Sequence, residues 1–177
     1  GSIKVFTIDD EGEEQVIGFY LPGELLGMDA IDSRLHMSTA KSMETSSVCE
    51  IPFDSIEDLS TSIRNLQMHM YKLLSREIRI DQELQMLLAK KTAEERIGAF
   101  LMNLSMRYDQ RRLSSTRFRL PMARSDIGNY LGLAVETVSR IFTRMQTMGV
   151  LRVEGKEVEI LDRQSLCNIA HVRDEEI

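Results

Sequence analysis

The fold of this chain is decided by residues 131–146, Leu131-Gly-Leu-Ala-Val135-Glu136-Thr137-Val-Ser139-Arg140-Ile-Phe-Thr-Arg144-Met-Gln146. Apolar residues recur within them at helical spacing and give the segment one buried face, made of Val135, Val138, Ile141, Phe142 and Met145. A shorter helical segment, residues 124–131, precedes it, and Gly132-Leu-Ala forms the turn between the two. The stretch therefore predicts two helices joined by a tight turn, a helix-turn-helix.

The opposite face of the second helix carries short acceptors and guanidinium groups, at Glu136, Thr137, Ser139, Arg140 and Arg144. The N-terminal end of a recognition helix enters the major groove of DNA. There an Arg can bind guanine O6 and N7, and a carboxylate can accept from cytosine N4. These side chains therefore indicate a protein that binds double-stranded DNA.

The net charge of −6 argues against DNA binding until it is divided along the chain. Residues 1–88 hold 7 basic and 16 acidic side chains, whereas residues 90–153 hold 12 basic and 5 acidic ones. Because phosphate binding depends on local charge, this distribution favours a basic nucleic-acid module behind an acidic regulatory one. Chance scatter of solvated charges is the alternative explanation.

The first 53 residues have the pattern of short antiparallel strands. Two of them, Ile3–Ile8 and residues 15–19, flank an acidic turn at residues 9–14 that contains Gly12, and residues 47–51 alternate like a third strand. We expect part of a barrel or roll. Because the chain opens with Gly1-Ser2 directly into a strand, we interpret its start as that of a fragment or a processed product.

From Ile56 to about Ala89 the pattern becomes that of one long helix. Its apolar residues fit a heptad seam, which Glu77 interrupts: Ile63, Leu66, Met70, Leu73, Ile80, Leu84 and Leu87. A second stripe lies beside the first: Tyr71, Leu74, Ile78, Asp81, Gln85 and Leu88. Two stripes need two neighbours, so we predict that one packs on the β portion and the other on a second copy of the chain. A single amphipathic helix on its own domain is the alternative.

The C-terminal part begins with a capping box, in which Thr92 and Glu95 satisfy free amides at the start of a new helix. The domain boundary is placed at residues 89–92. A short strand at 118–120 precedes the helix-turn-helix, and a hairpin that turns near Gly155 follows it as the wing of a winged helix. Asp162 is expected to cap a short last helix. These elements predict an α+β protein.

Composition excludes several function classes. No apolar run approaches the ~18 residues of a membrane span, and we expect no signal peptide. Two cysteines, Cys49 and Cys167, cannot make a disulfide framework, and free thiols point to the cytoplasm. Because His36, His69 and His171 are scattered and no nucleophile elbow, paired-carboxylate motif or phosphate loop is present, we predict that the protein is not an enzyme.

Three segments carry a resemblance to a known family: Ser47-Val-Cys49-Glu-Ile-Pro-Phe53, Asn129-Tyr-Leu-Gly-Leu133 and Val135-Glu136-Thr-Val-Ser139-Arg140. With them the chain resembles the FNR branch of the cyclic-AMP receptor/FNR superfamily of bacterial transcription regulators. The resemblance implies a partial β-roll sensor domain of cupin-like jelly-roll type (1–55), a dimerisation helix (56–90) and a winged-helix DNA-binding domain (91–177). It also implies a homodimer that binds palindromes with TTGAT-type half-sites and activates or represses transcription.

Carried over by position, the resemblance assigns base contacts to Glu136, Ser139 and Arg140, and a thymine-methyl contact to Val135. With the flanking groups, the predicted DNA-binding residues are Val135, Glu136, Thr137, Ser139, Arg140, Arg124 and Arg144. In one departure from the family, Ala123 and Ala134 stand where helix N-caps are expected. An Ala cap is ~1 kcal/mol less stable than Ser or Thr.

The resemblance also assigns a dimer interface, made of Tyr71, Leu74, Ile78, Asp81 and Gln85. Facing carboxylates across a two-fold axis repel, and burying them unpaired is costly. We therefore expect Asp81 to keep the inactive form monomeric. An Asp81 that merely faces solvent is the alternative.

The resemblance gives Cys49 a role as well. FNR proteins hold an oxygen-labile 4Fe–4S cluster with four cysteines, three near the N-terminus and one at the position of Cys49. The other three are absent from these 177 residues, so the chain alone is not expected to hold the cluster. A lone Cys on a strand is, by itself, more often a small buried apolar residue. Cys167 is expected to be structural.

Several rival functions stay open. A cyclic-nucleotide sensor needs a guanidinium clamp after the turn at residues 23–25, but Met37 stands where that Arg would fall. A haem sensor that uses His36 and Cys49, a cluster-independent DNA-binding regulator and a protein-interaction module are further alternatives. For RNA polymerase, the resemblance offers two surfaces, the acidic turn at residues 9–14 and the polar loop at residues 108–118.

Overall fold

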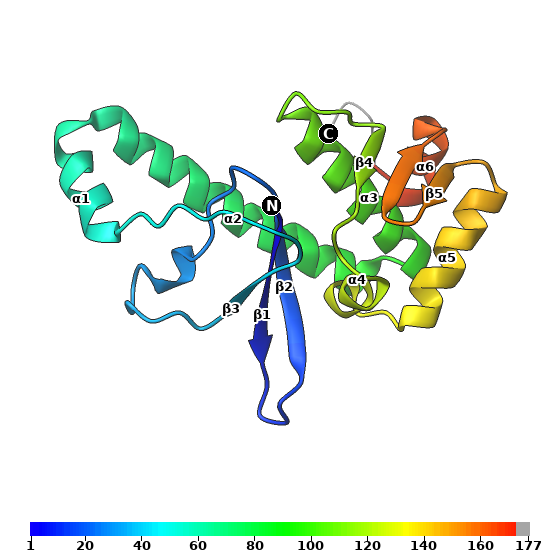
Figure 1. The fold of residues 1–177 in the computed structure, drawn as a ribbon, viewed down its shortest axis with the longest axis horizontal. Coiled ribbons are helices and arrows are strands. Elements are labelled where there is room, and N and C mark those ends of the chain that lie inside the picture. Colours follow the sequence, from blue (N-terminus) through cyan, green and yellow to red (C-terminus); the bar gives the residue numbers. More distant parts are fainter. Residues whose placement is uncertain (173–177) are drawn as a thin grey trace. The chain divides into compact units, whose positions relative to one another are not determined.

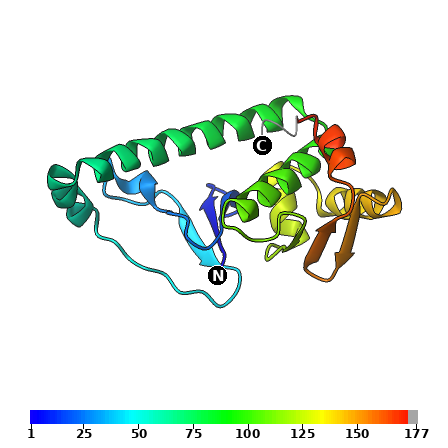
Figure 2. The same cartoon turned by 90° about the horizontal axis from the view of Figure 1, so that it is seen from above.

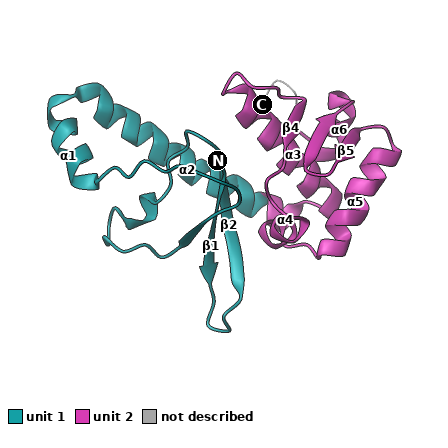
Figure 3. Ribbon diagram, in the orientation of Figure 1, with its two compact units in different colours: residues 1–86 teal, residues 87–177 magenta. Residues whose placement is uncertain are grey.

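Residues 1–172 are described by the computed structural model, which combines antiparallel sheets with helices (Figure 1). They fall into two compact units, one ending at Met86 and the other beginning at Leu87 (Figure 3). The predicted α+β class is confirmed. Among the described residues, no helix is both long and apolar enough to cross a membrane.

A three-stranded antiparallel sheet opens the first unit. Its strands are β1 (Ile3–Ile8), β2 (Glu14–Tyr20) and β3 (Thr39–Ser42), in the order β2-β1-β3. Asp9 closes the turn predicted between β1 and β2, because its Oδ1 accepts from two amides of the turn at 2.9 Å. A shift of register between Val5 and Phe6 lets both side chains be buried, together with Val16 and Phe19 of β2.

The strand predicted at residues 47–51 is wrong. These residues form no strand, and Val48 among them is 70% exposed. Strand β1 pairs instead with β2 on one side and β3 on the other. A 3-10 turn, η1 (Met28–Ala30), interrupts the loop between β2 and β3.

Two helices replace the single long helix expected from Ile56 to Ala89. Helix α1 (Phe53–Ser62) ends at Ile63, whose φ of −110° and ψ of 87° are not helical, and α2 (Arg64–Lys90) follows at once (Figure 2). The hydroxyls at residues 60–62 each donate to a carbonyl three residues earlier, a local bond that competes with the helical ladder. No residue of α1 or α2 is buried.

Four helices pack around a small sheet in residues 87–172. The helices are α3 (Ala93–Asp109), α4 (Arg124–Leu131), α5 (Val135–Thr147) and α6 (Arg163–Ala170). The strands β4 (Arg117–Arg119), β5 (Leu151–Glu154) and β6 (Glu157–Ile160) have the order β4-β6-β5. The core consists of buried apolar residues from these elements: Ile97, Leu101, Leu104, Ile127, Leu131, Val138, Met145, Val158 and Leu166.

The ends of α3 and α4 are fixed by predicted local signals. The capping box of α3 is present, since the amide of Thr92 donates to the Glu95 carboxylate and lowers the pKa of Glu95. Gly132 ends α4 at φ +63°, as a tight turn requires. A Cβ on Gly128 would lie only 2.5 Å from the carbonyl oxygen of Leu133, so glycine permits the turn before α5 to approach α4 closely.

The wing is the hairpin of β5 and β6, which turns at Gly155 as predicted. Lys156 Nζ donates to the carbonyl oxygen of Pro121 at 3.1 Å, while the exposed Glu154 and Glu157 are paired across the two strands. The end of the wing is therefore acidic. Beyond it, the side chain of Asp162 accepts from an amide of α6 at 2.9 Å and caps this helix as predicted.

Candidate nucleic-acid interface

Helix α5 presents a polar face opposite its buried one. Glu136, Ser139 and Arg140 are exposed within its first two turns, and Thr137 is half-buried beside them. Val135, predicted to lie on the buried face, is 40% exposed at the N-terminal end. The residues of α5 that are buried are Val138, Ile141, Phe142 and Met145.

The charges on this polar face are available to a ligand. Within residues 1–172, neither Glu136 nor Arg140 forms an ion pair, although they stand one helical turn apart. The N-cap residue Ala134 makes no side-chain hydrogen bond, so the positive end of α5 lacks a side-chain cap. Free charges and amides thus meet at the end of the helix that a major groove would receive.

Arg124, in the first turn of α4, lies over the ring of Phe142. Its guanidinium carbon is 3.5 Å from the ring centroid. Burial lowers the pKa of Arg124, and no carboxylate among residues 1–172 pairs with its guanidinium. A partly desolvated cation without an anion is well prepared to contact a phosphate.

Arg144, the other flanking cation, already has a partner. Its Nη1 lies 3.2 Å from Oε2 of Glu94 in α3, and Arg144 belongs to the last turn of α5. Base edges are met mainly by the N-terminal part of a recognition helix. The structure therefore favours Arg140 over Arg144 for a base contact.

The two stripes of α2 differ in burial. The heptad seam is mostly half-buried, at Leu66, Met70, Leu73, Ile80, Leu84 and Leu87, whereas Ile63 is exposed in the break before α2. In the second stripe, Tyr71 is 57% and Ile78 59% exposed, Asp81 and Gln85 are exposed too, and Leu74 is half-buried. Large apolar side chains left open along one face favour a docking surface.

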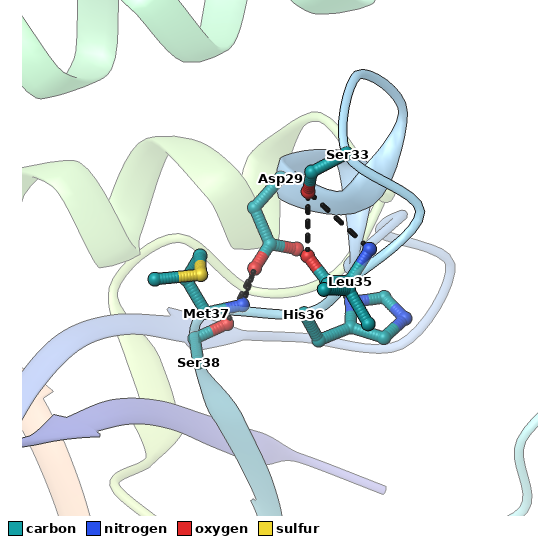
Figure 4. Close-up of polar contacts among 6 residues, drawn as sticks. All are labelled: Asp29, Ser33, Leu35, His36, Met37 and Ser38. Carbon is teal, nitrogen blue, oxygen red and sulfur yellow. Dashed lines mark hydrogen bonds and ion pairs between the residues drawn. The ribbon is translucent and has the colours of Figure 1, made fainter.

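The loop between β2 and β3 is closed around Asp29. Its Oδ1 lies 3.2 Å from Nδ1 of His36, and its Oδ2 accepts from the amide of Met37 at 3.2 Å and the hydroxyl of Ser38 at 3.0 Å (Figure 4). Partial burial raises the pKa of Asp29, but these hydrogen bonds outweigh it, so the pKa lies below its usual value. An internal carboxylate thus occupies the hydrogen-bond donors of Met37 and Ser38 in this loop.

The two thiols lie in different units. Cys49 is exposed in the irregular segment before α1, so it is not a buried apolar residue, and Cys167 is buried in α6. A 4Fe–4S cluster requires four ligands, usually thiolates. Among the described residues, no group of three or more His, Cys, Asp or Glu is arranged to hold a metal ion. The side chains present do not fit a whole cluster, and Cys49 offers one accessible ligand.

Known proteins share this arrangement. Residues 95–169 match the family of Crp-like helix-turn-helix domains, and residues 1–62 match cyclic nucleotide-binding domains. The chain is 53% identical to the transcriptional activator protein FnrA of Stutzerimonas stutzeri, over 96% of this chain and 70% of that protein. It is 51% identical to the fumarate and nitrate reduction regulatory protein of Escherichia coli, over 98% and 70%. The chain belongs to the FNR family.

Solved structures share the FNR-family fold. FixK2 from Bradyrhizobium japonicum has a TM-score of 0.72 at 26% identity, over 96% of this chain and 83% of that one. A CRP-family regulator from Thermus thermophilus has a TM-score of 0.74 at 18% identity, over 97% and 84%, a likeness of fold alone. As an FNR-family member, the chain is a DNA-binding transcription regulator and not an enzyme.

Sequence reasoning missed two contacts in this FNR-family chain. Phe142 was assigned only to the core, although its ring also carries Arg124. Arg96, near the start of α3, donates to three backbone carbonyls. A signal for Arg96 existed, because a cation near the positive end of a helix is unfavourable unless its side chain is anchored elsewhere.

Proposed function

We propose that this FNR-family regulator binds, as a homodimer, palindromic DNA with TTGAT-type half-sites and responds to oxygen. The DNA part of the proposal is carried by the first two turns of α5, where Glu136, Ser139 and Arg140 share one exposed face. In this proposal residues 1–55 belong to the sensor, residues 56–90 form the dimerisation region, whose contacts come from α2 (Arg64–Lys90), and residues 91–177 bind DNA.

Each side chain on this face suits a base edge. Arg140 is assigned to guanine, because its fork of donors matches O6 and N7, and Glu136 to cytosine, whose N4 donates to a carboxylate. Ser139 and Thr137 add hydroxyls, and the exposed methyl groups of Val135 suit a thymine methyl. Each good bidentate contact gives about 1–3 kcal/mol of discrimination.

Arg124 and Arg144 are assigned to the phosphate backbone. Arg124 stands at the start of α4, where the Asp126 carboxylate already accepts from the amide of Ala123 at 3.2 Å, so the phosphate contact is assigned to the guanidinium of Arg124. Arg144 must first leave Glu94, whose side chain is half-buried while that of Arg144 is exposed; a pair so open to solvent on one side is worth about 1 kcal/mol.

A second copy of the chain is the partner assigned to the second stripe of α2. A palindromic site requires a two-fold axis, and the stripe supplies apolar contacts from Tyr71, Leu74 and Ile78, with Gln85 at its end. Asp81 would face its own copy across that axis, where carboxylates repel. Asp81 therefore keeps the inactive form monomeric. A change at the sensor that stabilises the dimer by a few kcal/mol shifts the monomer–dimer equilibrium toward the dimer.

Cys49 is proposed as one of four thiolate ligands of a 4Fe–4S cluster, which when bound supplies the oxygen reactivity. Its exposure leaves Sγ accessible, and identities of 51% and 53% to FNR-type regulators support the role. Because the sequence holds two cysteines and Cys167 is buried elsewhere, the other three ligands have to come from outside these 177 residues.

A cyclic-nucleotide-responsive regulator is the second candidate, since residues 1–62 match cyclic nucleotide-binding domains. The Asp29 loop disfavours it. Met37 stands where the clamp Arg is expected, and its amide donates to Asp29. A nucleotide phosphate would have to displace that carboxylate or add a like charge beside it.

RNA polymerase is the proposed partner of two surface loops. The acidic turn at residues 9–14 is held in shape by Asp9. The loop at residues 108–118 is closed by the stacked rings of Tyr108 and Phe118, whose centroids lie 5.1 Å apart. In both loops, these contacts fix the backbone from which the charged side chains project.

DNA recognition is tested by fluorescence anisotropy with a labelled TTGAT palindrome and a scrambled duplex of equal length. The chain and its Asp81→Ala variant are both titrated, so that a weak dimer does not hide binding. We expect the palindrome to bind at least about a thousandfold more tightly than the scrambled duplex. Equal affinity for the two duplexes would overturn the proposal.

The sensor part is tested by anaerobic reconstitution of the full-length gene product with iron and sulfide. Iron content, visible absorbance and sedimentation are measured before and after exposure to oxygen. We expect a cluster-loaded dimer that becomes monomeric in air, and loss of the cluster in Cys49→Ser but not in Cys167→Ala. A protein that binds no iron and whose association state does not change with oxygen would contradict the sensor role. It would not contradict the proposed DNA recognition.

A further inference from the structure

Arg96 of α3 joins three backbone carbonyls from two places in the chain, the end of α2 and the end of α4. Its Nε donates to the carbonyl oxygen of Lys91 at 3.0 Å, Nη2 to that of Leu88 at 2.8 Å and Nη1 to that of Leu131 at 2.9 Å. Leu88 lies in the last turn of α2, and Leu131 is the last residue of α4. One guanidinium therefore connects the end of the long helix to the turn of the helix-turn-helix.

Both helix ends favour such a partner. The last carbonyls of a helix lack intrahelical donors, and this end carries partial negative charge, so a cation that donates there is favourable on both counts. Leu131 is fully buried, which makes an unpaired carbonyl at this place costly. The planar fork of Arg suits three carbonyls in a way that the single ammonium of Lys does not.

Packing brings the same segments together. A Cβ built on Gly132 would lie 3.5 Å from Nη1 of Arg96 and 3.9 Å from Cδ2 of Leu88. Only two residues, Lys91 and Thr92, separate α2 from α3, and the capping box fixes this junction. The end of α2, the start of α3 and the turn before α5 thus form one packed corner.

We propose that Arg96 is a positioning residue for DNA recognition, which fastens the end of α4, and through it the helix-turn-helix, to the end of the dimerisation helix and so sets the half-site spacing that the dimer accepts. This inference rests on the proposed homodimer and its palindromic site. Without Arg96 the base-contacting side chains of α5 are unchanged, but the second half-site is engaged at a lower effective concentration.

The test compares a palindrome of natural spacing with duplexes that carry one or two extra base pairs between the half-sites. Each added pair turns one half-site by about 34° around the DNA axis. Wild type, Arg96→Met and Arg96→Lys are compared in the Asp81→Ala background, with dimers verified by sedimentation and folding by thermal unfolding. Arg163→Gln is the matched control, because Arg163 also makes an internal hydrogen bond, to Oγ of Ser105 at 2.9 Å.

We expect Arg96→Met to bind the naturally spaced palindrome about tenfold more weakly and to lose most of its preference over the lengthened duplexes. Arg96→Lys should be intermediate, and Arg163→Gln should keep the preference of the wild type. A folded Arg96→Met dimer with the full spacing preference overturns the inference.

A second measurement keeps the inference separate from the proposed function. If no dimer forms, or if the wild type does not bind the palindrome, the proposed function fails. The role of Arg96 is then tested by a distance measurement that needs no DNA. Spin labels at Gln82→Cys and Met148→Cys in a Cys49→Ser protein report the distance between α2 and the end of α5. Arg96→Met should broaden that distance distribution, and an unchanged width contradicts the role of Arg96.

Discussion

Under the proposed function, we expect base recognition to depend most on Arg140, because its guanidinium is exposed near the start of α5 and has no ion pair within residues 1–172. Arg140→Ala should weaken binding to the TTGAT palindrome by about 1–3 kcal/mol for each half-site and relax the preference for guanine at one position of each half-site. Anisotropy titrations with single-base variants of the duplex measure both effects.

A matched control for Arg140 is Arg152→Ala, which removes an exposed wing arginine paired with Glu159 at 2.8 Å. This variant should keep the base preferences of the wild type. If Arg140→Ala weakens every duplex by the same factor, Arg140 contacts phosphate rather than a base.

Asp29 makes the first unit sensitive to acid. Its hydrogen bonds hold its pKa below the usual value, so their contribution is fully present above about pH 3.9 and is lost as the pH falls through the lowered pKa. The amide chemical shift of Met37, followed by NMR on acidification, should change only at that acid end. Asp29→Asn is the control and should abolish the transition; a midpoint above the usual value would contradict the assigned hydrogen bonds.

Residues could be predicted from sequence where a period decides their environment. Helical spacing alone placed Glu136, Ser139 and Arg140 on the exposed face of α5. It wrongly placed Val135 in the core. Val135 has the spacing of a buried residue, but as the first residue of α5 it is exposed to solvent at the helix end. The contact of Arg96 with Leu131 spans 35 residues and depends on how helices pack, so no local pattern could give it.

Among the elements, α5 has an end that can be improved. Ala134 has the extended φ of −63° and ψ of 144° of an N-cap residue but makes no side-chain hydrogen bond. Ala134→Ser should stabilise the domain by about 1 kcal/mol, since its hydroxyl can accept from an amide of the first turn. Urea unfolding measures the gain, with Ala89→Ser in the last turn of α2 as a control that should not stabilise. An unchanged midpoint for Ala134→Ser would show that the cap is satisfied by water.

Elements with a strong local signal were predictable and those that depend on neighbours were not. Strands β1 and β2, the capping box of α3 and the wing all carry turn or cap residues that act locally. Strand β3 exposes all four of its residues, so no alternation marks it, and it forms because β1 offers a free edge. The heptad pattern continues through Ile63, so the pattern alone could not predict the break between α1 and α2.

For the whole molecule, the state of association should depend on Asp81. Asp81→Ala should shift the chain in air from monomer toward dimer, with a dissociation constant lower by at least about tenfold, because two facing carboxylates no longer repel. Sedimentation equilibrium measures the change. Glu83→Ala is the control, since Glu83 is an exposed acid that lies 3.7 Å from Arg79 of its own helix. A monomeric Asp81→Ala protein would leave Asp81 as a residue that merely faces solvent.

For the whole chain, the sequence shows an acidic part up to residue 88 and a basic part from residue 90. The boundary between the two compact units, at Met86 and Leu87, lies near this change of charge. The partner that covers the second stripe of α2 could not be predicted as directly as the division into two units. A single chain shows which apolar side chains are open, but their partner is a property of the assembly.

The wing has a consequence for the response to ionic strength. Lys156 is tied to the carbonyl of Pro121, and the hairpin end presents Glu154 and Glu157. Two carboxylates beside one lysine give the hairpin end a net negative charge, so we expect it to add less to counterion release than the cations of α4 and α5. The affinity of the regulator should therefore fall less steeply with salt than the 12 basic side chains of residues 90–153 suggest.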